Sequence, residues 1–353
     1  MAKSVALKWV EIDRKAVAAN IRTVRRSLQP GVRMMAVVKA DAYGHGAEKI
    51  ARLAQIGGAD GLGVLTLQEA LDLRRAGIRG RIILLAPPLP AEAPAVIAAE
   101  LEVTIDSFTL ARALSRAAKR AVPVHVDVDY GLGRWGLPPR DIPEWSRRLP
   151  RLPRLKWTGL SAHLDYVPGQ NTVEVEDKLR AFHRLAYRVK SALPSVVRHC
   201  ANSSILLDFP HWQMDMVRIG NLIYGINPTS RELPLRNPWR LLARIISIKD
   251  VGKGRSIGYA SEYLAPRRMR VAALPVGYSD GLTMEPAERF IGFGKGFRYW
   301  GMLRGRRVHF VGRCGIAHVL VDVSAVPKAR VGDVVELPIR RTSASARLPR
   351  VYV

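Results

Sequence analysis

Short apolar stretches alternate with helical patterns through the first two thirds of the chain. Eight stretches carry consecutive β-rich apolar residues, and most of the segments between them repeat apolar positions at helical spacing. Alternating strands and helices indicate a parallel sheet with right-handed crossovers. The predicted strands span residues 33–38, 61–65, 81–85, 101–105, 122–128, 156–161, 195–199 and 215–219, and examples of predicted helices span 47–55, 67–76, 108–119 and 173–192.

The number of predicted strands bears on the topology of this sheet. Eight strands in about 200 residues is the number that closes a (β/α)8 barrel, and an open eight-stranded sheet is the competing arrangement. The regular spacing of the strands favours closure. We therefore expect an α/β fold in which a (β/α)8 TIM-like barrel is followed by a C-terminal, mainly-β domain.

The pattern changes near Pro228, and this change places the second domain. Beyond Trp239 the chain shows strand-like stretches punctuated by Gly and Pro, without long helical patterns. These stretches span residues 241–248, 269–274, 307–310, 318–323 and 334–337. Residues 5–12 also alternate like a strand. We expect residues 12–235 to form the barrel, and residues 1–11 with 236–353 to form the β domain.

Composition narrows the class of protein. A chain of 353 residues with 48% hydrophobic residues fits two domains with a large core. No apolar run reaches membrane-spanning length, and the N-terminal residues lack a signal peptide's apolar stretch, so no membrane association is expected. Cys200 and Cys314 are the two cysteines of the chain, too few for a disulfide framework or a zinc cluster. We expect a cytoplasmic protein without a metal site.

The net charge of +26 raises the question of a nucleic-acid partner. The basic residues are spread along the chain instead of forming a long tail, and aromatic residues do not interleave with them. An arginine-rich, solvated surface accounts for this charge better. We expect no specific nucleic-acid partner.

Candidate chemistry begins at Lys39, which ends the first predicted barrel strand within residues 36–46, AVVKADAYGHG. A lysine at the tip of a buried strand can be partly desolvated, which lowers its pKa and provides a neutral amine. Such an amine can form a Schiff base with a carbonyl cofactor. The simpler alternative is a strand-end lysine that reaches into solvent. The residues at the other strand ends distinguish between these two interpretations of Lys39.

Polar residues follow several other predicted strands, where the active sites of barrels form. Each has a plain structural explanation when taken singly: His163 can be a core residue and Ser203 a helix N-cap. The loops after the last two strands commonly bind phosphate. A lysine for a Schiff base together with a phosphate cradle suggests pyridoxal phosphate. The residues that converge are Lys39, Tyr43, Asp127, Asp129, Arg134, His163, Asn202, Ser203, Ser204, Arg218, Gly220 and Asn221.

At these motifs the chain resembles the alanine racemases, the barrel-type (fold-type III) pyridoxal-phosphate enzymes. The resemblance covers nearly the whole chain. Its most specific segments are residues 36–46, 129–136, 218–225, 257–263, PVGYSDG at 275–281 and the terminal RLPRVYV at 347–353.

The resemblance implies a role for each matching residue. Lys39 would carry pyridoxal 5'-phosphate as a Schiff base, Arg218 would face the pyridine nitrogen, and His163 would brace the ring. Arg134 would approach the cofactor's phenolic oxygen and the substrate carboxylate, and the backbone N–H of Ile316 would also contact that carboxylate. The phosphate would be held by Tyr43, Ser203, Gly220 and Asn221.

The resemblance also implies a homodimer with shared active sites. Tyr259 in the β domain matches the family's second catalytic acid/base and would enter the partner subunit's barrel. Lys39 and Tyr259 would then exchange the α-proton of an amino acid from opposite faces. The implied activity is interconversion of L- and D-alanine, which supplies D-alanine for peptidoglycan precursors.

Three positions depart from the family pattern. Asp127 stands where a lysine that can be carbamylated is frequent, and Ala317 stands where an aspartate is usual. Ala346 replaces a tyrosine that narrows the substrate entrance in the family. The last change leaves one alternative open, a broad-specificity racemase that acts on serine or larger amino acids through a widened entrance.

Overall fold

The computed structural model describes residues 6–261, 263–282, 299–339 and 341–353. The chain divides into two compact units. The barrel unit comprises Arg14–Asn237, and the β unit combines Met1–Asp13 with Pro238–Val353.

The barrel unit contains an eight-stranded sheet in the order β8-β7-β6-β5-β4-β3-β2-β9. Its strands pair in parallel, as the alternating pattern predicts. They are β2 (Arg33–Val37), β3 (Gly61–Val64), β4 (Ile82–Leu84), β5 (Glu102–Ile105), β6 (Val122–Val128), β7 (Leu155–Ala162), β8 (Val197–His199) and β9 (Met216–Ile219).

Hydrogen bonds between the segments of β8 and β9 close this sheet. The Asp215 amide donates to the Arg198 carbonyl at 3.2 Å, and the Arg218 amide donates to the Ala201 carbonyl at 2.8 Å. Strand β9 pairs with β2 on its other side. The predicted (β/α)8 barrel is therefore confirmed, and the open eight-stranded sheet is not the topology of this chain.

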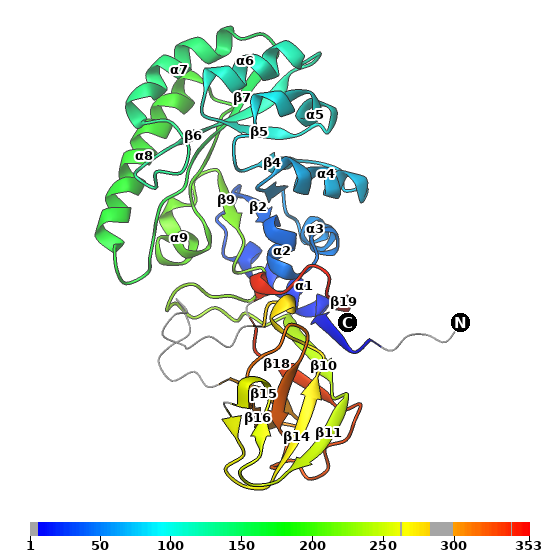
Figure 1. Cartoon of the computed structure of the whole chain (residues 1–353). Coiled ribbons are helices and arrows are strands. Elements are labelled where there is room, and N and C mark those ends of the chain that lie inside the picture. Colours follow the sequence, from blue (N-terminus) through cyan, green and yellow to red (C-terminus); the bar gives the residue numbers. More distant parts are fainter. Residues whose placement is uncertain (1–5, 262, 283–298, 340) are drawn as a thin grey trace. The chain divides into compact units, whose positions relative to one another are not determined.

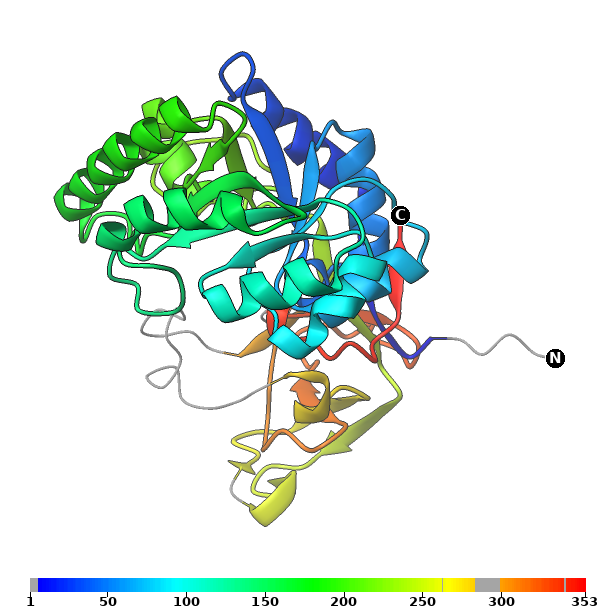
Figure 2. The same cartoon turned by 90° about the horizontal axis from the view of Figure 1, so that it is seen from above.

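Helices connect the strands and lie outside them (Figures 1 and 2). Each longer helix buries one apolar face; Thr66 caps one of them in a capping box with Glu69. They are α1 (Arg14–Arg26), α2 (Lys39–Gly44), α3 (Ala47–Ile56), α4 (Leu67–Arg75), α5 (Ala93–Ala98), α6 (Phe108–Ala117), α7 (Ile142–Arg148), α8 (Thr172–Ala192) and α9 (Ser203–Asp208). The short 3-10 turns are η1 (Pro90–Glu92), η2 (Pro139–Asp141), η3 (Leu149–Arg151) and η4 (Pro210–Trp212).

The interior of the barrel has an apolar part and an ionic part. Met35, Ile83, Val197 and Met216 form a buried apolar cluster. The ionic part is a chain in which Arg81 pairs with Glu102, Glu102 bonds His125 at 2.8 Å, and His125 bonds His199 at 2.9 Å. Gly159 makes this chain possible, because a Cβ there would lie 2.0 Å from His125 Nδ1.

The described part of the β unit contains three sheets. A six-stranded sheet has the order β16-β15-β18-β10-β1-β19, and smaller sheets have the orders β11-β14-β17 and β12-β13. Its described strands are β1 (Lys8–Ile12), β10 (Trp239–Arg244), β11 (Ser247–Val251), β12 (Ser256–Ile257), β13 (Tyr263–Leu264), β14 (Met269–Leu274), β15 (Trp300–Leu303), β16 (Arg306–His309), β17 (Val319–Asp322), β18 (Val334–Leu337) and β19 (Arg350–Tyr352). Short 3-10 turns lie at η5 (Tyr259–Ser261), η6 (Tyr278–Asp280) and η8 (Arg341–Ser343).

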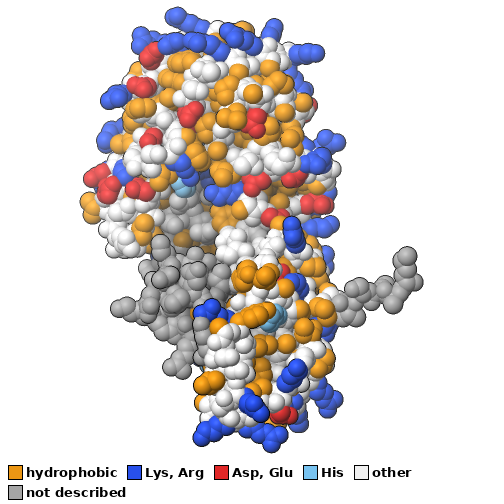
Figure 3. All heavy atoms as spheres, viewed as in Figure 1, with side chains coloured by type: hydrophobic (Ala, Val, Ile, Leu, Met, Phe, Trp, Pro, Cys, Tyr) orange, Lys and Arg blue, Asp and Glu red, His pale blue; other side chains and the backbone are white. Residues whose placement is uncertain are grey.

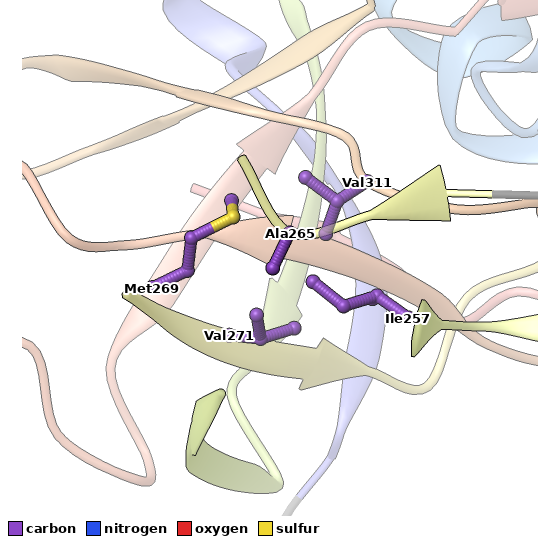
Figure 4. Close-up of a cluster of buried hydrophobic side chains, with 5 residues drawn as sticks. All are labelled: Ile257, Ala265, Met269, Val271 and Val311. Atoms are coloured by element: carbon purple, nitrogen blue, oxygen red, sulfur yellow. The ribbon is translucent and has the colours of Figure 1, made fainter. Parts of the chain in front are cut away.

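The β unit contains a small apolar core that includes Ile257, two residues before Tyr259. Ile257, Ala265, Met269, Val271 and Val311 pack together there, each less than a tenth exposed (Figure 4). The predicted N-terminal strand is present as β1, which pairs with β10 and β19. Through this sheet, strand β1 near the N-terminus pairs with strands from the C-terminal part of the chain.

Candidate active site

A cavity of about 220 Å³ lies at the carboxyl ends of the barrel strands. All eight barrel residues to which the sequence assigns a role at the site line it, so the fold brings these distant positions together. They are Lys39, Tyr43, Arg134, His163, Ser203, Arg218, Gly220 and Asn221. Further lining residues are Val37, Leu65, Leu85, Asp127, Trp135, Asn202 and Ser204.

Lys39 follows β2 and is half-buried at the cavity. Burial lowers the pKa of its amine, and the positive charges of Arg134 and Arg218 lower it further. Glu69 opposes this shift through its negative charge. The environment of Lys39 therefore favours the neutral, nucleophilic form of the amine.

The backbone after Lys39 forms a left-handed turn. Residues 40–43 have φ values between 52° and 55°, although none of them is glycine. Each such residue costs about 1–2 kcal/mol relative to a right-handed conformation, so the turn needs support from its surroundings. The Ala40 amide donates to Glu69 Oε1 at 2.6 Å, and Asp41 Oδ1 accepts from the Ala47 amide at 2.9 Å. Sequence reasoning missed both this turn and the role of Glu69.

Tyr43 is positioned by a second tyrosine and by a glycine. Its ring stacks on Tyr224 with the ring centroids 4.7 Å apart, and the Tyr224 hydroxyl donates to the Val37 carbonyl at 2.8 Å. A Cβ on Gly220 would lie 2.6 Å from the Tyr43 hydroxyl. Gly220 thus leaves the space that the phenol of Tyr43 occupies. Tyr224 lies within the matching segment 218–225, but only the packing reveals its supporting role.

Ser203 begins α9 and presents a buried hydroxyl to the cavity. The N-cap of this helix is Asn202, whose Oδ1 accepts from the Ile205 amide at 3.0 Å. The Ser203 hydroxyl has no hydrogen-bond partner among the described residues. A buried hydroxyl without a partner is costly, so Ser203 is suited to a ligand that accepts a hydrogen bond from it.

Arg218 is buried at the end of β9, with 8% of its surface exposed. Its guanidinium donates to the carbonyls of Ala162 and Cys200. Its Nη2 lies 3.5 Å from His163 Nδ1. Burial and the charge of Arg218 lower the pKa of His163 to about 3, so His163 is neutral at physiological pH.

Asp127 places a carboxylate against the cations of the cavity. It is 5% exposed, and its Oδ1 accepts a short hydrogen bond from the Ser161 hydroxyl. Burial raises the pKa of Asp127, whereas Arg218, the Ser161 hydrogen bond and Arg134 act in the opposite direction. Arg134 in turn lies over the ring of Trp135, with its guanidinium carbon 3.6 Å from the ring centroid.

The two remaining candidate residues belong to the β unit. Tyr259 is 59% exposed, and its ring centroid lies 5.6 Å from that of His318. Ile316 is 62% exposed, and its carbonyl accepts from the Ser279 amide at 3.0 Å. The backbone around Tyr259 is tightly turned, because Gly258, Ala260 and Ser261 have positive φ values. Both candidate side chains are therefore presented on the surface of their own unit.

The donor set of the barrel cavity fits pyridoxal phosphate. The Ser203 hydroxyl, the Tyr43 hydroxyl and the glycine at position 220 suit an anionic phosphate, and the amine of Lys39 suits an aldehyde. No group of three possible metal ligands occurs among the described residues. Likewise, the described helices include none that is both long and apolar enough to cross a membrane. The fold and cavity are thus those of a barrel whose lysine amine is suited to a carbonyl cofactor.

Comparison with known proteins identifies the family. Residues 12–228 match the model of the alanine racemase N-terminal domain, and residues 239–348 match that of the C-terminal domain. The chain belongs to the alanine racemase family.

Individual relatives agree with this assignment. The alanine racemase of Desulfovibrio desulfuricans is 34% identical over 98% of both chains. Among solved structures, alanine racemase from Clostridium difficile 630 aligns with a TM-score of 0.91 at 25% identity, covering 99% of this chain and 97% of the other. Alanine racemase from Streptomyces lavendulae aligns with a TM-score of 0.87 at 29% identity, covering 99% and 98%.

Proposed function

We propose that this protein interconverts L- and D-alanine with pyridoxal 5'-phosphate as its cofactor. The observation that carries the proposal is the pairing of a Lys39 amine of lowered pKa with the buried cation Arg218 in one cavity. The named relatives are alanine racemases, and this favours alanine over the broader substrate range left open by Ala346. The alternative of a broad-specificity racemase is therefore not favoured.

The residues that would hold the cofactor surround the cavity on several strand ends. Lys39 would bind its aldehyde carbon, and Tyr43 with Ser203 would donate hydrogen bonds to its phosphate. Gly220 and Asn221 would approach that phosphate through their backbone. When bound, the cofactor supplies an acceptor for the electrons released as the substrate loses its α-proton.

Arg218 limits the chemistry that the site performs. Its pKa is lowered by burial, but the Asp127 carboxylate opposes that shift, and guanidinium groups remain protonated in proteins. Arg218 can donate a hydrogen bond to the pyridine nitrogen but cannot accept a proton from it. This arrangement favours simple proton exchange at the α-carbon over reactions that require a protonated ring.

Racemisation needs one proton-transfer group on each face of the substrate. The amine of Lys39 would remove or deliver the α-proton on one face. The phenol of the partner subunit's Tyr259 would do so on the other face. The exposed position of Tyr259 on the β unit supports a role toward a second copy of the chain.

The substrate carboxylate would be bound by Arg134 and by the backbone N–H of Ile316. Leu65 and Leu85 give the cavity apolar walls, which suit a small side chain such as a methyl group. Neutral His163 would lie against the cofactor ring without adding charge.

The cellular setting follows from this activity. We propose a cytoplasmic homodimer that supplies D-alanine for peptidoglycan precursors. Cys200 and Cys314 are both free thiols, which suits a reducing compartment. Lys and Arg side chains lie at many separate places on the visible face in Figure 3, which suits a general surface charge and not a nucleic-acid groove.

A racemisation assay across a panel of L-amino acids, with and without added pyridoxal phosphate, tests the proposal. We expect activity with alanine, dependence on pyridoxal phosphate and loss of activity in Lys39→Ala. Larger amino acids should react much more slowly. Absence of alanine racemisation in protein saturated with cofactor would refute the proposed function.

A further inference from the structure

A second cavity, which we call the floor cavity, opens at the amino ends of β4, β5 and β6. Its volume is about 480 Å³, compared with about 220 Å³ for the cavity at Lys39. The two cavities share no lining residue. The catalytic proposal does not use the floor cavity, so its composition requires a separate explanation.

Arginine dominates the charged lining of the floor cavity. Four guanidinium groups face two carboxylates there, which leaves a formal excess of two positive charges. The arginines are Arg74, Arg79, Arg81 and Arg120, and the carboxylates are Glu100 and Glu102. Gathering guanidinium groups around one hollow is electrostatically unfavourable without a compensating anion.

Two of the four arginines are already committed to the protein. Arg74 donates to the carbonyls of Ile78, Gly80, Ala99 and Glu100. Arg81 forms a two-point pair with Glu102, which continues into the ionic chain inside the barrel. These contacts hold the guanidinium groups of Arg74 and Arg81 in place. Neither group is available to rearrange around a ligand.

The other charged groups are free to respond to a ligand. Arg120 pairs with Glu100, but both side chains are about two-thirds exposed, at 67% and 65%. Such a pair is weak in water. Arg79 makes no hydrogen bond or ion pair through its side chain within the described parts of the chain, although its charge acts on both Arg74 and Glu100.

Glu100 also has an unusual backbone conformation. Its φ of 52° lies in the left-handed region, which is unfavourable for a residue with a side chain. The Leu101 amide donates to the Val96 carbonyl at 3.2 Å, so this left-handed residue closes the C-terminal end of α5. The cap fixes Glu100 at the rim of the cavity, where its side chain pairs with Arg120.

We propose that the floor cavity binds a small multivalent oxyanion, a phosphate or carboxylate compound with a short carbon skeleton. Arg79 and Arg120 would supply forked hydrogen bonds to its oxygens, and Glu100 would release Arg120 on binding. The apolar side of the cavity, formed by Ile97, Ala98 and Pro123, would contact the skeleton. The concave shape suits a small molecule better than a nucleic-acid backbone.

Isothermal titration of the full chain tests this proposal, with glycerol 2-phosphate and citrate as separate probes. The protein is first loaded with pyridoxal phosphate, so that the cradle at Tyr43 and Ser203 does not compete, and free cofactor is then removed because it is itself a small phosphate compound. Salt is held near physiological strength, where exposed charges more than about 8 Å apart are screened. Comparison of the probes distinguishes a phosphate ligand from a carboxylate ligand.

Three variants and one control are expected to change the affinity for the preferred probe in different directions. Arg79→Gln and Arg120→Gln should each weaken binding of the preferred probe about tenfold, the effect of losing one charge-assisted contact. Glu100→Gln should strengthen it, because it removes a competing carboxylate. Arg188→Gln changes charge on α8 outside the cavity and should leave affinity unchanged.

The proposal is overturned by any of three results. The first is that neither probe binds the wild-type protein. The second is that Glu100→Gln does not strengthen binding. The third is that Arg188→Gln weakens binding as much as Arg79→Gln does. The third result would show that the protein binds the probe through its overall positive charge and not through the floor cavity. Because none of these residues lines the Lys39 cavity, each outcome is independent of the racemase proposal.

Discussion

Gly220 and Tyr43 lie so close that a single methyl group on the glycine would displace the tyrosine. A Cβ at Gly220 would be 2.6 Å from the Tyr43 hydroxyl and 3.0 Å from Cζ of the same ring. The ring cannot retreat freely, because it is stacked on buried Tyr224. The shape of the cavity around Tyr43 therefore depends on the absence of a side chain at position 220.

Gly220→Ala should accordingly weaken cofactor binding. We expect the dissociation constant for pyridoxal phosphate to rise about tenfold or more, equivalent to about 1.4 kcal/mol, because the Tyr43 hydroxyl must move. Gly61→Ala is a matched control on β3, where the nearest atom to a new Cβ is 3.4 Å away. Absorbance titration of cofactor-free protein measures both constants, and equal affinities in the two variants would contradict the argument.

The reactivity of Lys39 should depend on pH in a defined direction. Its pKa is lowered from 10.5, so the neutral amine is present at lower pH than in a free lysine. The rate at which cofactor-free protein reacts with pyridoxal phosphate should rise with pH and reach half its maximum below pH 10.5. Stopped-flow absorbance across pH values measures this midpoint.

Arg134→Gln tests the electrostatic cause of that shift. Removing this positive charge should raise the Lys39 pKa and move the midpoint to higher pH, because Arg134 disfavours the ammonium form. Arg188→Gln on the outer surface should leave the midpoint in place. A midpoint that does not move in Arg134→Gln would exclude Arg134 as a cause and leave burial and the charge of Arg218 as the sources of the shift.

Asp127 should matter for catalysis without any need for carbon dioxide. Its carboxylate is buried beside Arg218 and Arg134, so Asp127→Asn leaves two nearby cations without their counter-charge. We expect kcat to fall about tenfold or more, and the free energy of unfolding in urea to fall by about 3 kcal/mol or more, because buried Arg218 loses its counter-charge. Wild-type activity should be unchanged by added bicarbonate, and a bicarbonate requirement would show that Asp127 does not supply the needed negative charge.

Tyr259→Phe separates cofactor binding from proton transfer. Loss of the hydroxyl should reduce kcat for alanine by about 100-fold to 10,000-fold, the range for a general acid or base. The affinity for pyridoxal phosphate should stay within about twofold of wild type, since Tyr259 is proposed to act on the α-proton. Tyr187→Phe, on the exposed side of α8, is the control. Full activity in Tyr259→Phe would exclude the two-base mechanism.

Glu102 should stabilise the barrel in a pH-dependent way. Its pKa is lowered from 4.5 to about 2 through its bonds to Arg81 and His125, which outweigh the effect of burial. The carboxylate therefore contributes stability above the unfolded-state pKa, and this contribution is lost as pH falls toward 2. Glu102→Gln should lower the free energy of unfolding by roughly 3 kcal/mol at pH 7 and by much less near pH 3. Urea unfolding at both pH values measures the difference.

The sequence by itself determined the barrel and the chemical character of its mouth. Alternating apolar strands and amphipathic helices specify parallel strands, because each buries its apolar side chains in only one arrangement of layers. Lys39, Arg218 and Ser203 could be assigned to one site from the sequence, since the carboxyl ends of parallel strands meet at one edge.

Only the tertiary structure decided how these residues are supported. The left-handed turn after Lys39 consists of ordinary residues, and it exists because Glu69 from another helix accepts its backbone hydrogen bond. The closeness of Gly220 to Tyr43 and the ionic chain from Arg81 to His199 are likewise contacts between segments distant in sequence. Local patterns encode which elements form, whereas these contacts depend on atoms that become neighbours only after the barrel has closed.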